Sequence, residues 1–291
     1  GLGVGTFYLT SDCSGGAITS VDILASNYLS QNFYFKNDTA ETLTITADPG
    51  GGSGLTSVNQ SITINARTPD TWIANTSMLA PTARRSHSAV WTGSEMIVWG
   101  GYTLISRSNT GERYNPVTDS WGTATQTTGA PLARSSHSAI WTGSEMIIWG
   151  GYDGAAYINT GGRYNPATDS WGTATQTTGA PLARSSHSAV WTGSEMIIWG
   201  GSTGSATNTG GRYNPATNSW GTATQTTGAP SARASHSAIW TGSEMIIWGG
   251  YDSSLTNTGG RYNPATDSWG AATQTTGAPL ARASHSAIWT G

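Results

Sequence analysis

The feature that most constrains this chain is a stretch of about fifty residues that recurs along it. The histidines measure its period directly, because successive histidines are separated by 50, 50, 49 and 49 residues. Each copy also contains a Gly-Gly doublet. A period near fifty with paired glycines predicts a β-propeller rather than a helical solenoid. The five histidines in this register are His87, His137, His187, His236 and His285.

Four copies share three landmarks, namely the Gly-Gly doublet, a tyrosine, and a tryptophan seven residues after that tyrosine. In one copy these are Gly150-Gly151, Tyr164 and Trp171. The pattern resembles the Kelch family, over roughly three quarters of the chain. This resemblance implies four-stranded antiparallel blades. The other copies are Gly100-Gly101, Tyr114 and Trp121; Gly200-Gly201, Tyr213 and Trp220; and Gly249-Gly250, Tyr262 and Trp269.

We therefore expect an all-β protein that contains a Kelch-type β-propeller of four complete blades. Each blade is expected to run through four strands in the order a, b, c, d, with the histidine on strand d, which is usually the outer strand in this family. A leading half-blade of c and d strands is expected before them. The expected limits are 67–291 for the propeller, 72–93 for the half-blade, and 94–143, 144–193, 194–242 and 243–291 for the blades.

The tryptophans explain how such blades pack. All fourteen fall on a, c or d positions of the repeat, and an indole is a large, rigid apolar wedge that buries about 200 Å². We expect the histidines to hydrogen-bond within their own blades. The residues assigned to the scaffold are the five histidines and the strand a tryptophans Trp99, Trp149, Trp199 and Trp248.

Residues 1–66 differ from the repeat and predict a small β-sandwich. Short apolar alternations separated by turn residues indicate strands at 6–10, 17–24, 32–36, 42–47 and 61–65. The stretch 33–47 resembles the late strands of bacterial immunoglobulin-like surface modules. Such sandwiches normally need about 100 residues, so this module is expected to be partial, with its opening strands upstream of Gly1.

Composition excludes several classes of function. Charged residues make up 10% of the chain, against a usual value of about 25%. With a net charge of -3 and one lysine, counterion release cannot drive nucleic-acid binding. No apolar run reaches about 18 residues, so membrane insertion is not expected. Cys13 is the only cysteine, which excludes an internal disulfide. These traits indicate a secreted or cell-surface bacterial protein.

Titratable residues recur too regularly to suggest an enzyme. Glu145, Arg163, Arg184 and His187 all have counterparts in other copies, whereas a catalytic site is a single asymmetric constellation. We therefore expect no catalytic residues, no metal and no cofactor.

The copies differ mainly in the links between strands a and b, at 102–109, 152–159, 202–208 and 251–257. In an up-and-down blade these links share one face, which we call the variable face. The b–c and d–a links share the other, the uniform face. Loops on a rigid scaffold commonly carry recognition, although drift in unconstrained loops explains the variation equally well. The candidate binding residues are Tyr102, Arg107, Tyr152, Asp153, Tyr157, Tyr251 and Asp252.

The sequence leads to a non-enzymatic extracellular binding or adhesion module that recognises a glycan or a protein through propeller loops. The uniform face suits a repetitive ligand such as a polysaccharide, and the variable face suits a specific one; the sequence does not choose. Two alternatives stay open. One is a structural element that forms a fibre or oligomer by sharing blade strands, because unpaired strand edges attract partners. The other is a carbohydrate-active enzyme.

Overall fold

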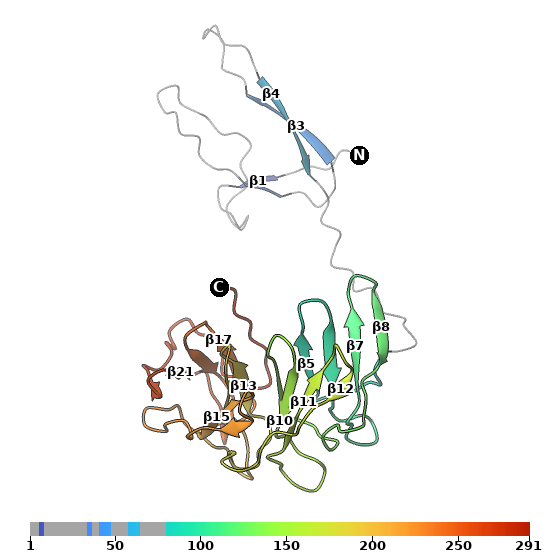
Figure 1. The fold of residues 1–291 in the computed structure, drawn as a ribbon. Helices are drawn as coiled ribbons and strands as arrows, with labels where there is room; N and C mark the ends of the chain where they lie inside the picture. The colour runs from blue at the N-terminus through green and yellow to red at the C-terminus, as the bar shows by residue number, and fades with distance from the viewer. Residues whose placement is uncertain (1–5, 9–33, 37–40, 48–57, 65–79) are drawn as a thin grey trace. The chain divides into compact units, whose positions relative to one another are not determined.

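The computed structural model describes residues 6–8, 34–36, 41–47, 58–64 and 80–291 (Figure 1), the first four segments as backbone only. The chain divides into two compact units, Gly1–Ala74 and Asn75–Gly291, and each is described by itself. All regular structure in the described segments is β-strand. No helix that could cross a membrane is found in them.

The first unit contains two antiparallel pairs. β1 (Thr6–Tyr8) pairs with β2 (Tyr34–Lys36), and β3 (Glu41–Ala47) pairs with β4 (Val58–Ile64). These four strands overlap the strands expected at 6–10, 32–36, 42–47 and 61–65. The strand expected at 17–24 and the boundary expected at residues 66 and 67 lie outside the described residues. The immunoglobulin-like sandwich therefore stays a prediction.

The second unit contains four antiparallel sheets of four strands each, which confirms the all-β class and the four-stranded antiparallel blades that the Kelch resemblance implies. We number the sheets one to four. Sheet one holds β5 (Ser88–Trp91), β6 (Met96–Trp99), β7 (Gly111–Asn115) and β8 (Ser120–Ala124). Sheet two holds β9 (Ser138–Trp141), β10 (Met146–Trp149), β11 (Gly161–Asn165) and β12 (Ser170–Trp171). Sheet three holds β13 (Ser188–Trp191), β14 (Met196–Trp199), β15 (Gly210–Asn214) and β16 (Ser219–Trp220). Sheet four holds β17 (Ser237–Trp240), β18 (Met245–Trp248), β21 (Gly259–Asn263) and β22 (Ser268–Trp269), with the small hairpin β19 (Tyr251–Asp252) and β20 (Ser254–Leu255) in its β18–β21 link.

The grouping of strands into sheets corrects the expected order. The strand that follows each histidine is the first of its sheet, not the last, because β13 pairs with β14, which comes after it. Only Thr192–Glu195 separate these strands, and the Thr192 amide donates to the Glu195 carbonyl at 3.0 Å. So short a link forces an antiparallel pair. The half-blade 72–93 and the blade limits 94–143, 144–193, 194–242 and 243–291 therefore do not match the sheets.

The first strands of the four sheets also lie next to one another. β5 contacts β9, β9 contacts β13, and β13 contacts β17. Just before these strands, the Ser136 amide donates to the Ser86 carbonyl and the Ser186 amide to the Ser136 carbonyl, both at 2.9 Å. The histidine-bearing strand is thus the inner strand of each blade rather than the outer one expected.

The last copy of the repeat does not form the expected strand d around His285. Its Ser284 amide donates to the Ser235 carbonyl at 2.8 Å, so the segment follows the inner strands. No strand pairs with it in the part of the chain that the structure describes. Ile288 and Trp289 are consequently 85% and 49% exposed.

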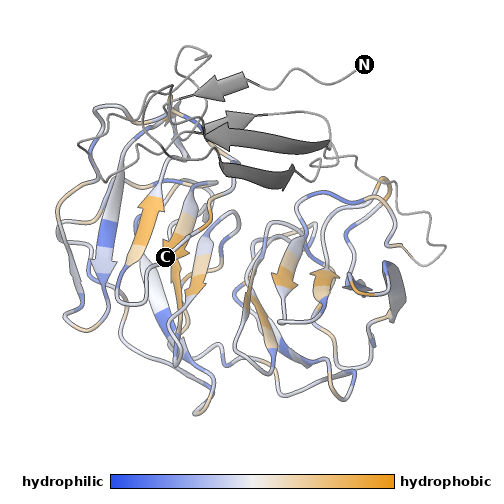
Figure 2. Cartoon of the chain, turned by 90° about the horizontal axis from the view of Figure 1, so that it is seen from above, coloured by the Kyte–Doolittle hydropathy of each residue, from blue (hydrophilic) through white to orange (hydrophobic). Residues whose placement is uncertain are grey.

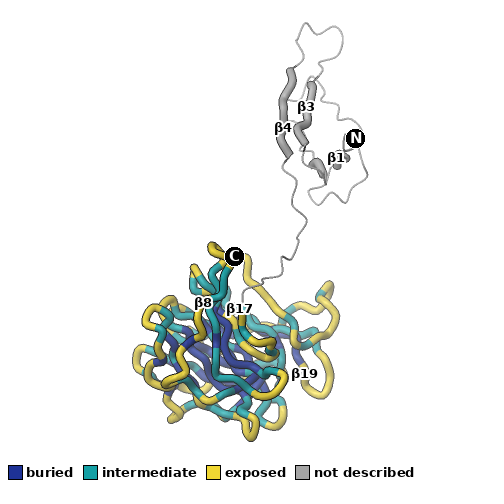
Figure 3. Tube along the Cα trace, turned by 90° about the vertical axis from the view of Figure 1, so that its right-hand side faces the viewer, coloured by how far each residue is buried: buried dark blue, intermediate teal, exposed yellow. Residues whose placement is uncertain are grey.

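The core lies between sheets, and strand alternation explains why. On β10, Ile147 and Trp149 pack toward sheet three, whereas Met146 and Ile148 pack toward sheet one. Both faces of a middle sheet are therefore buried, which accounts for the unbroken apolar run in β10 and β14. Figure 2 shows the apolar colour concentrated in the strands, and Figure 3 shows the buried residues inside the second unit with exposed loops around them.

Tryptophans join these sheets in pairs. Trp149 of sheet two lies 5.1 Å from Trp220 of sheet three, measured between ring centroids. Trp99 packs on Trp171 and Trp199 on Trp269 in the same way. All three strand a tryptophans of sheets one to three are fully buried. Trp248 of the last sheet is only half-buried, because no equivalent indole covers it among residues 80–291.

Candidate functional site

The histidines join neighbouring sheets. His187 Nε2 lies 2.8 Å from the Ser138 hydroxyl of the preceding sheet, and its ring stands edge-on to Trp149 at 5.2 Å. The expected hydrogen bond within one blade is therefore wrong, because the inner strands lie close enough to be bridged directly. The same bond recurs from His137 to Ser88, from His236 to Ser188, and from His285 to Ser237. His87, at the start of the series, is exposed.

Burial keeps the imidazoles of His137, His187 and His236 neutral. It lowers the pKa of His137 and of His236 to about 3, and that of His187 well below its ordinary value, with the nearby arginine in each case adding to the effect. No group of three histidine, cysteine, aspartate or glutamate side chains that could hold a metal ion occurs in the described segments. The geometry therefore indicates a structural role for the histidines, which is to join neighbouring sheets.

The Gly-Gly doublets lie against these histidines. Gly150 has φ +69°, a left-handed conformation that suits glycine. A Cβ placed there would lie 2.7 Å from His187 Cε1 and 3.0 Å from the Arg184 carbonyl oxygen. The doublet therefore allows the end of strand β10 to approach the next inner strand closely.

A buried arginine lies beside each of the first three junctions, namely Arg134, Arg184 or Arg233. Arg184 is 1% exposed and donates from Nη1 to the carbonyls of Gly200 and Thr209, at 2.9 and 2.7 Å. Burial lowers its pKa to about 10. The half-buried pair of Arg163 and Glu145, 2.7 Å apart, lies instead within sheet two. Both arginines thus serve the scaffold.

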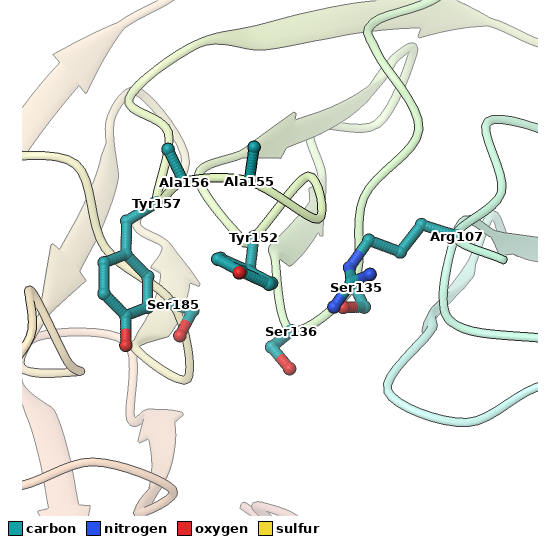
Figure 4. A pocket seen from close by; sticks show the side chains of 8 residues that line it. All are labelled: Arg107, Ser135, Ser136, Tyr152, Ala155, Ala156, Tyr157 and Ser185. Atoms are coloured by element: carbon teal, nitrogen blue, oxygen red, sulfur yellow. The ribbon is translucent and has the colours of Figure 1, made fainter.

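The variable face carries a hollow of about 490 Å³. Figure 4 shows Arg107, Tyr152 and Tyr157 around it, with serine hydroxyls between them. Arg107 comes from the β6–β7 link of sheet one, and both tyrosines come from the β10–β11 link of sheet two. The remaining lining residues are Ser135, Ser136 and Ser185, which precede inner strands, and Ala155 and Ala156.

A second hollow of about 370 Å³ adjoins the first, since Arg107 and Ser135 line both. Its other lining residues are Arg85, Ser86 and Tyr102. The guanidinium carbons of Arg85 and Arg107 lie 5.2 and 5.3 Å from the Tyr102 ring centre. Arg107 also lies 4.6 Å from the Tyr152 ring centre, so it is held between two aromatic faces.

Positive charge dominates these hollows. Neither Arg85 nor Arg107 forms a salt bridge within the described residues, and Arg107 Nε is buried there without a hydrogen-bond partner. The nearby Asp153 carboxylate accepts bonds from the amides of Ala155 and Ala156, both at 2.8 Å. These amide bonds lower the pKa of Asp153. Its carboxylate therefore shapes the loop, and the charge of Arg107 adds to the lowering of its pKa.

The structure brings together four of the seven candidate binding residues, namely Tyr102, Arg107, Tyr152 and Tyr157, with Asp153 in the adjoining turn. Tyr251 and Asp252 form strand β19 in the link of sheet four and line neither hollow.

Sequence reasoning missed Arg85 and the serines. A signal for Arg85 was present, because the other copies carry Ser135, Ser185, Ala234 and Ala283 at its position. Ser135 and Ser185 stand at this same variable position, whereas Ser136 gave no signal, because serine recurs at its position in every copy. Only the fold shows that these serines lie beside the variable links.

Residues 50–250 match a family model described as the KLHDC2/KLHL20/DRC7 Kelch-repeats domain. This range is 201 of the 291 residues, more than half of the chain. A search of curated proteins finds no match. Together with the four antiparallel sheets, the family match shows that the chain belongs to the Kelch-repeat family of the KLHDC2/KLHL20/DRC7 type.

Proposed function

We propose that the chain is a non-enzymatic binding module that recognises an acidic glycan at the two hollows of the variable face. One observation carries the proposal. Arg85 and Arg107 depart from the repeat, and both lie at these hollows over a tyrosine ring with no carboxylate partner in the described residues.

The chemistry of the hollows fits a sugar that carries a carboxylate or sulfate. A guanidinium group donates two parallel hydrogen bonds to such an anion. Tyrosine rings offer a flat, amphipathic surface against which the apolar side of a sugar ring can pack. Ser135, Ser136 and Ser185 add hydroxyl groups that can exchange hydrogen bonds with those of the sugar. The volume of about 490 Å³ lies within the range of about 300–1,000 Å³ typical of small-ligand sites.

The lining supports binding rather than catalysis. The eight residues around the larger hollow include no carboxylate, imidazole or thiol. These groups most often act as general acids and bases, and a serine hydroxyl needs such a base beside it to become a nucleophile. A panel of glycoside and sugar-alcohol substrates tests this part of the proposal, and turnover of any of them by the purified chain would contradict it.

Calorimetric titration with tetragalacturonic acid and with a neutral hexose tetramer tests the ligand class. We expect the acidic tetramer to bind at the variable face, more weakly as salt rises. Arg107→Gln should weaken its binding by tenfold or more, because a hydrogen bond to a charged group contributes about 1.5–3 kcal/mol. Arg261→Gln is the matched control, since this 53%-exposed arginine lies outside both hollows. Equal binding by the parent and Arg107→Gln would contradict the proposal.

The proposal extends to location and to the front unit. The low share of charged residues, 10%, and the single cysteine support a secreted or cell-surface bacterial protein. The β1–β2 and β3–β4 pairs are compatible with a partial immunoglobulin-like module that presents the propeller. Antibodies against residues 80–291 should label unpermeabilised source cells or their medium. Signal confined to the cell interior would contradict this location.

A further inference from the structure

The uniform face also has hollows, and they repeat. One groove of about 460 Å³ lies between sheets one and two, where Glu95, Trp141 and Asn165 line it. Another of about 450 Å³ lies between sheets three and four, where Glu195, Trp240 and Asn263 line it at the equivalent positions. Each groove is formed by the turn between the first two strands of one sheet and by two turns of the next.

An ion pair holds the wall of each groove. Arg212 Nη2 lies 2.7 Å from Glu195 Oε2, and Arg212 Nη1 donates to the Pro264 carbonyl of the next sheet at 2.9 Å. Arg163 makes the same two contacts, with Glu145 at 2.7 Å and with the Pro215 carbonyl at 2.8 Å. Sheets two and three are therefore joined as sheets three and four are.

The first groove follows the same plan with a looser ion pair. Arg113 donates to the Pro166 carbonyl at 2.8 Å but lies 3.9 Å from Glu95. The uniform face thus has three equivalent inter-sheet junctions in the described residues. Each presents one partly buried tryptophan, which is Trp141, Trp191 or Trp240.

We propose that these junctions bind a repeating neutral polysaccharide, with one sugar unit at each tryptophan. The indole supplies an amphipathic aromatic surface for a sugar ring. The glutamate carboxylate and the turn hydroxyls supply hydrogen-bond partners for sugar hydroxyls. Because each glutamate is paired with an arginine, the groove has no net charge to attract an anion. This site therefore differs from the cationic hollows of the variable face in both position and ligand class.

Repetition makes a polymer the preferred ligand. Three junctions of the same plan on one scaffold would convert the second and third contacts into intramolecular events. A long neutral chain should bind tenfold or more tightly than the single sugar, although each site has the same plan. A ligand with one sugar gains nothing from the repeat.

Oxidation mapping of the full chain with N-bromosuccinimide tests the proposal. The probes are soluble neutral polysaccharides, namely a β-glucan, a mannan and a galactan, each with its monosaccharide. At least one polysaccharide should protect Trp141, Trp191 and Trp240 from oxidation. Trp289, 49% exposed, serves as the control, because residues 80–291 form no sheet around it and so lack the two turns that complete a groove; it should stay reactive. Trypsin cuts after Arg134, Arg184 and Arg233, so the three tryptophans fall in different peptides.

Variants that fill the grooves keep the test independent of folding. Ser94, Ser144 and Ser194 are exposed turn residues that border the three junctions. Their triple replacement by tyrosine should abolish the protection and weaken polysaccharide binding by tenfold or more. The matched control replaces Thr128, Thr178 and Thr227, which are exposed and line none of the hollows, by tyrosine and should bind as the parent does.

Two results would overturn the proposal. One is that no neutral polysaccharide protects the tryptophans. The other is unchanged binding by the Ser94, Ser144 and Ser194 variant. Neither depends on tetragalacturonic acid binding at Arg107, so the variable-face proposal can fail or hold separately.

Discussion

The two faces of the propeller unit are built from the same repeat, yet they differ in where its copies depart from one another. On the uniform face, Glu145, Glu195 and Glu244 pair with equivalent arginines at 2.7–2.8 Å. On the variable face, position 107 is an arginine in one copy and Tyr157, Ala206 or Leu255 in the others. The scaffold beneath both faces tolerates that change because the links lie outside the inter-sheet cores. A repeat can therefore keep one face periodic while the other becomes specific.

The arginines of the two faces give the largest expected contrast. Arg184→Met should destabilise the fold by about 1–3 kcal/mol, because it leaves the buried carbonyl of Gly200 without its donor, whereas the Thr209 carbonyl keeps the bond from the Gly200 amide. Arg163→Met should cost less, about 1 kcal/mol, because its pair with Glu145 is half-buried and partly solvated. Urea unfolding of both variants measures the difference. Equal losses of unfolding free energy in the two variants would show that Arg184 stabilises the fold no more than Arg163 does.

Acid should weaken the inner-strand junctions below the variable face. The unfolded chain protonates its histidines near pH 6.5, whereas burial keeps His137 and His236 neutral down to about pH 3. Between these values the unfolded state binds more protons, so stability falls as pH falls. Each such histidine contributes about 1.4 kcal/mol per pH unit.

Unfolding measured from pH 7.5 to 5 tests this dependence before most carboxylates titrate. Stability should be nearly flat above pH 7 and should decline below pH 6.5. The decline should be smaller in His187→Asn, because this variant lacks one of the three buried imidazoles. A flat profile down to pH 5 would mean that the histidines are not buried as described.

Two glycines with positive φ compare the space available at the two faces. Gly150 lies against His187, whereas Gly143, in the β9–β10 turn of the uniform face, has nothing within 4 Å of an added Cβ. Both substitutions to alanine carry backbone strain, at φ +69° and +102°. Gly150→Ala should cost about 1–3 kcal/mol more, because it also overpacks the junction. Thermal unfolding of the two variants measures this difference. Equal losses of stability would mean that backbone strain alone accounts for both.

The smallest effect is expected at the tip of the first variable link. Leu104 and Ile105 are each 90% exposed. Replacing either by serine should change the free energy of unfolding by no more than about 0.5 kcal/mol. A loss above 1 kcal/mol, measured in urea, would show that the link belongs to the scaffold and would blur the contrast between the faces.

The sequence predicted the strands of the repeats but not how these strands group into sheets. Period and pattern placed the strands of the four sheets, because apolar residues such as Met146, Ile147, Ile148 and Trp149 recur at the same positions of each copy. A repeat does not show where one sheet ends, since the order d-a-b-c has the same period as a-b-c-d. The four-residue link from Trp191 to Met196 carried the missing information, because only neighbouring antiparallel strands can be joined so briefly.

The candidate site was predicted in part for a related reason. Departures from the repeat identified Tyr102, Arg107, Tyr152 and Tyr157, and the same comparison would have identified Arg85. The contribution of Ser136 could not be predicted in this way, because serine recurs at its position in every copy, whereas Ser135 and Ser185 occupy the variable position of Arg85. The fold alone places their hydroxyls beside the variable links of neighbouring sheets.

Hydrogen exchange of the full chain with and without tetragalacturonic acid tests most directly the claim that departures from the repeat carry recognition. The four variable links differ in sequence, so their peptides can be told apart. The account predicts slower exchange in residues 102–109 and 152–159 on binding, and no change in 202–208 and 251–257. Protection spread evenly over all four links, or confined to the uniform face, would contradict it.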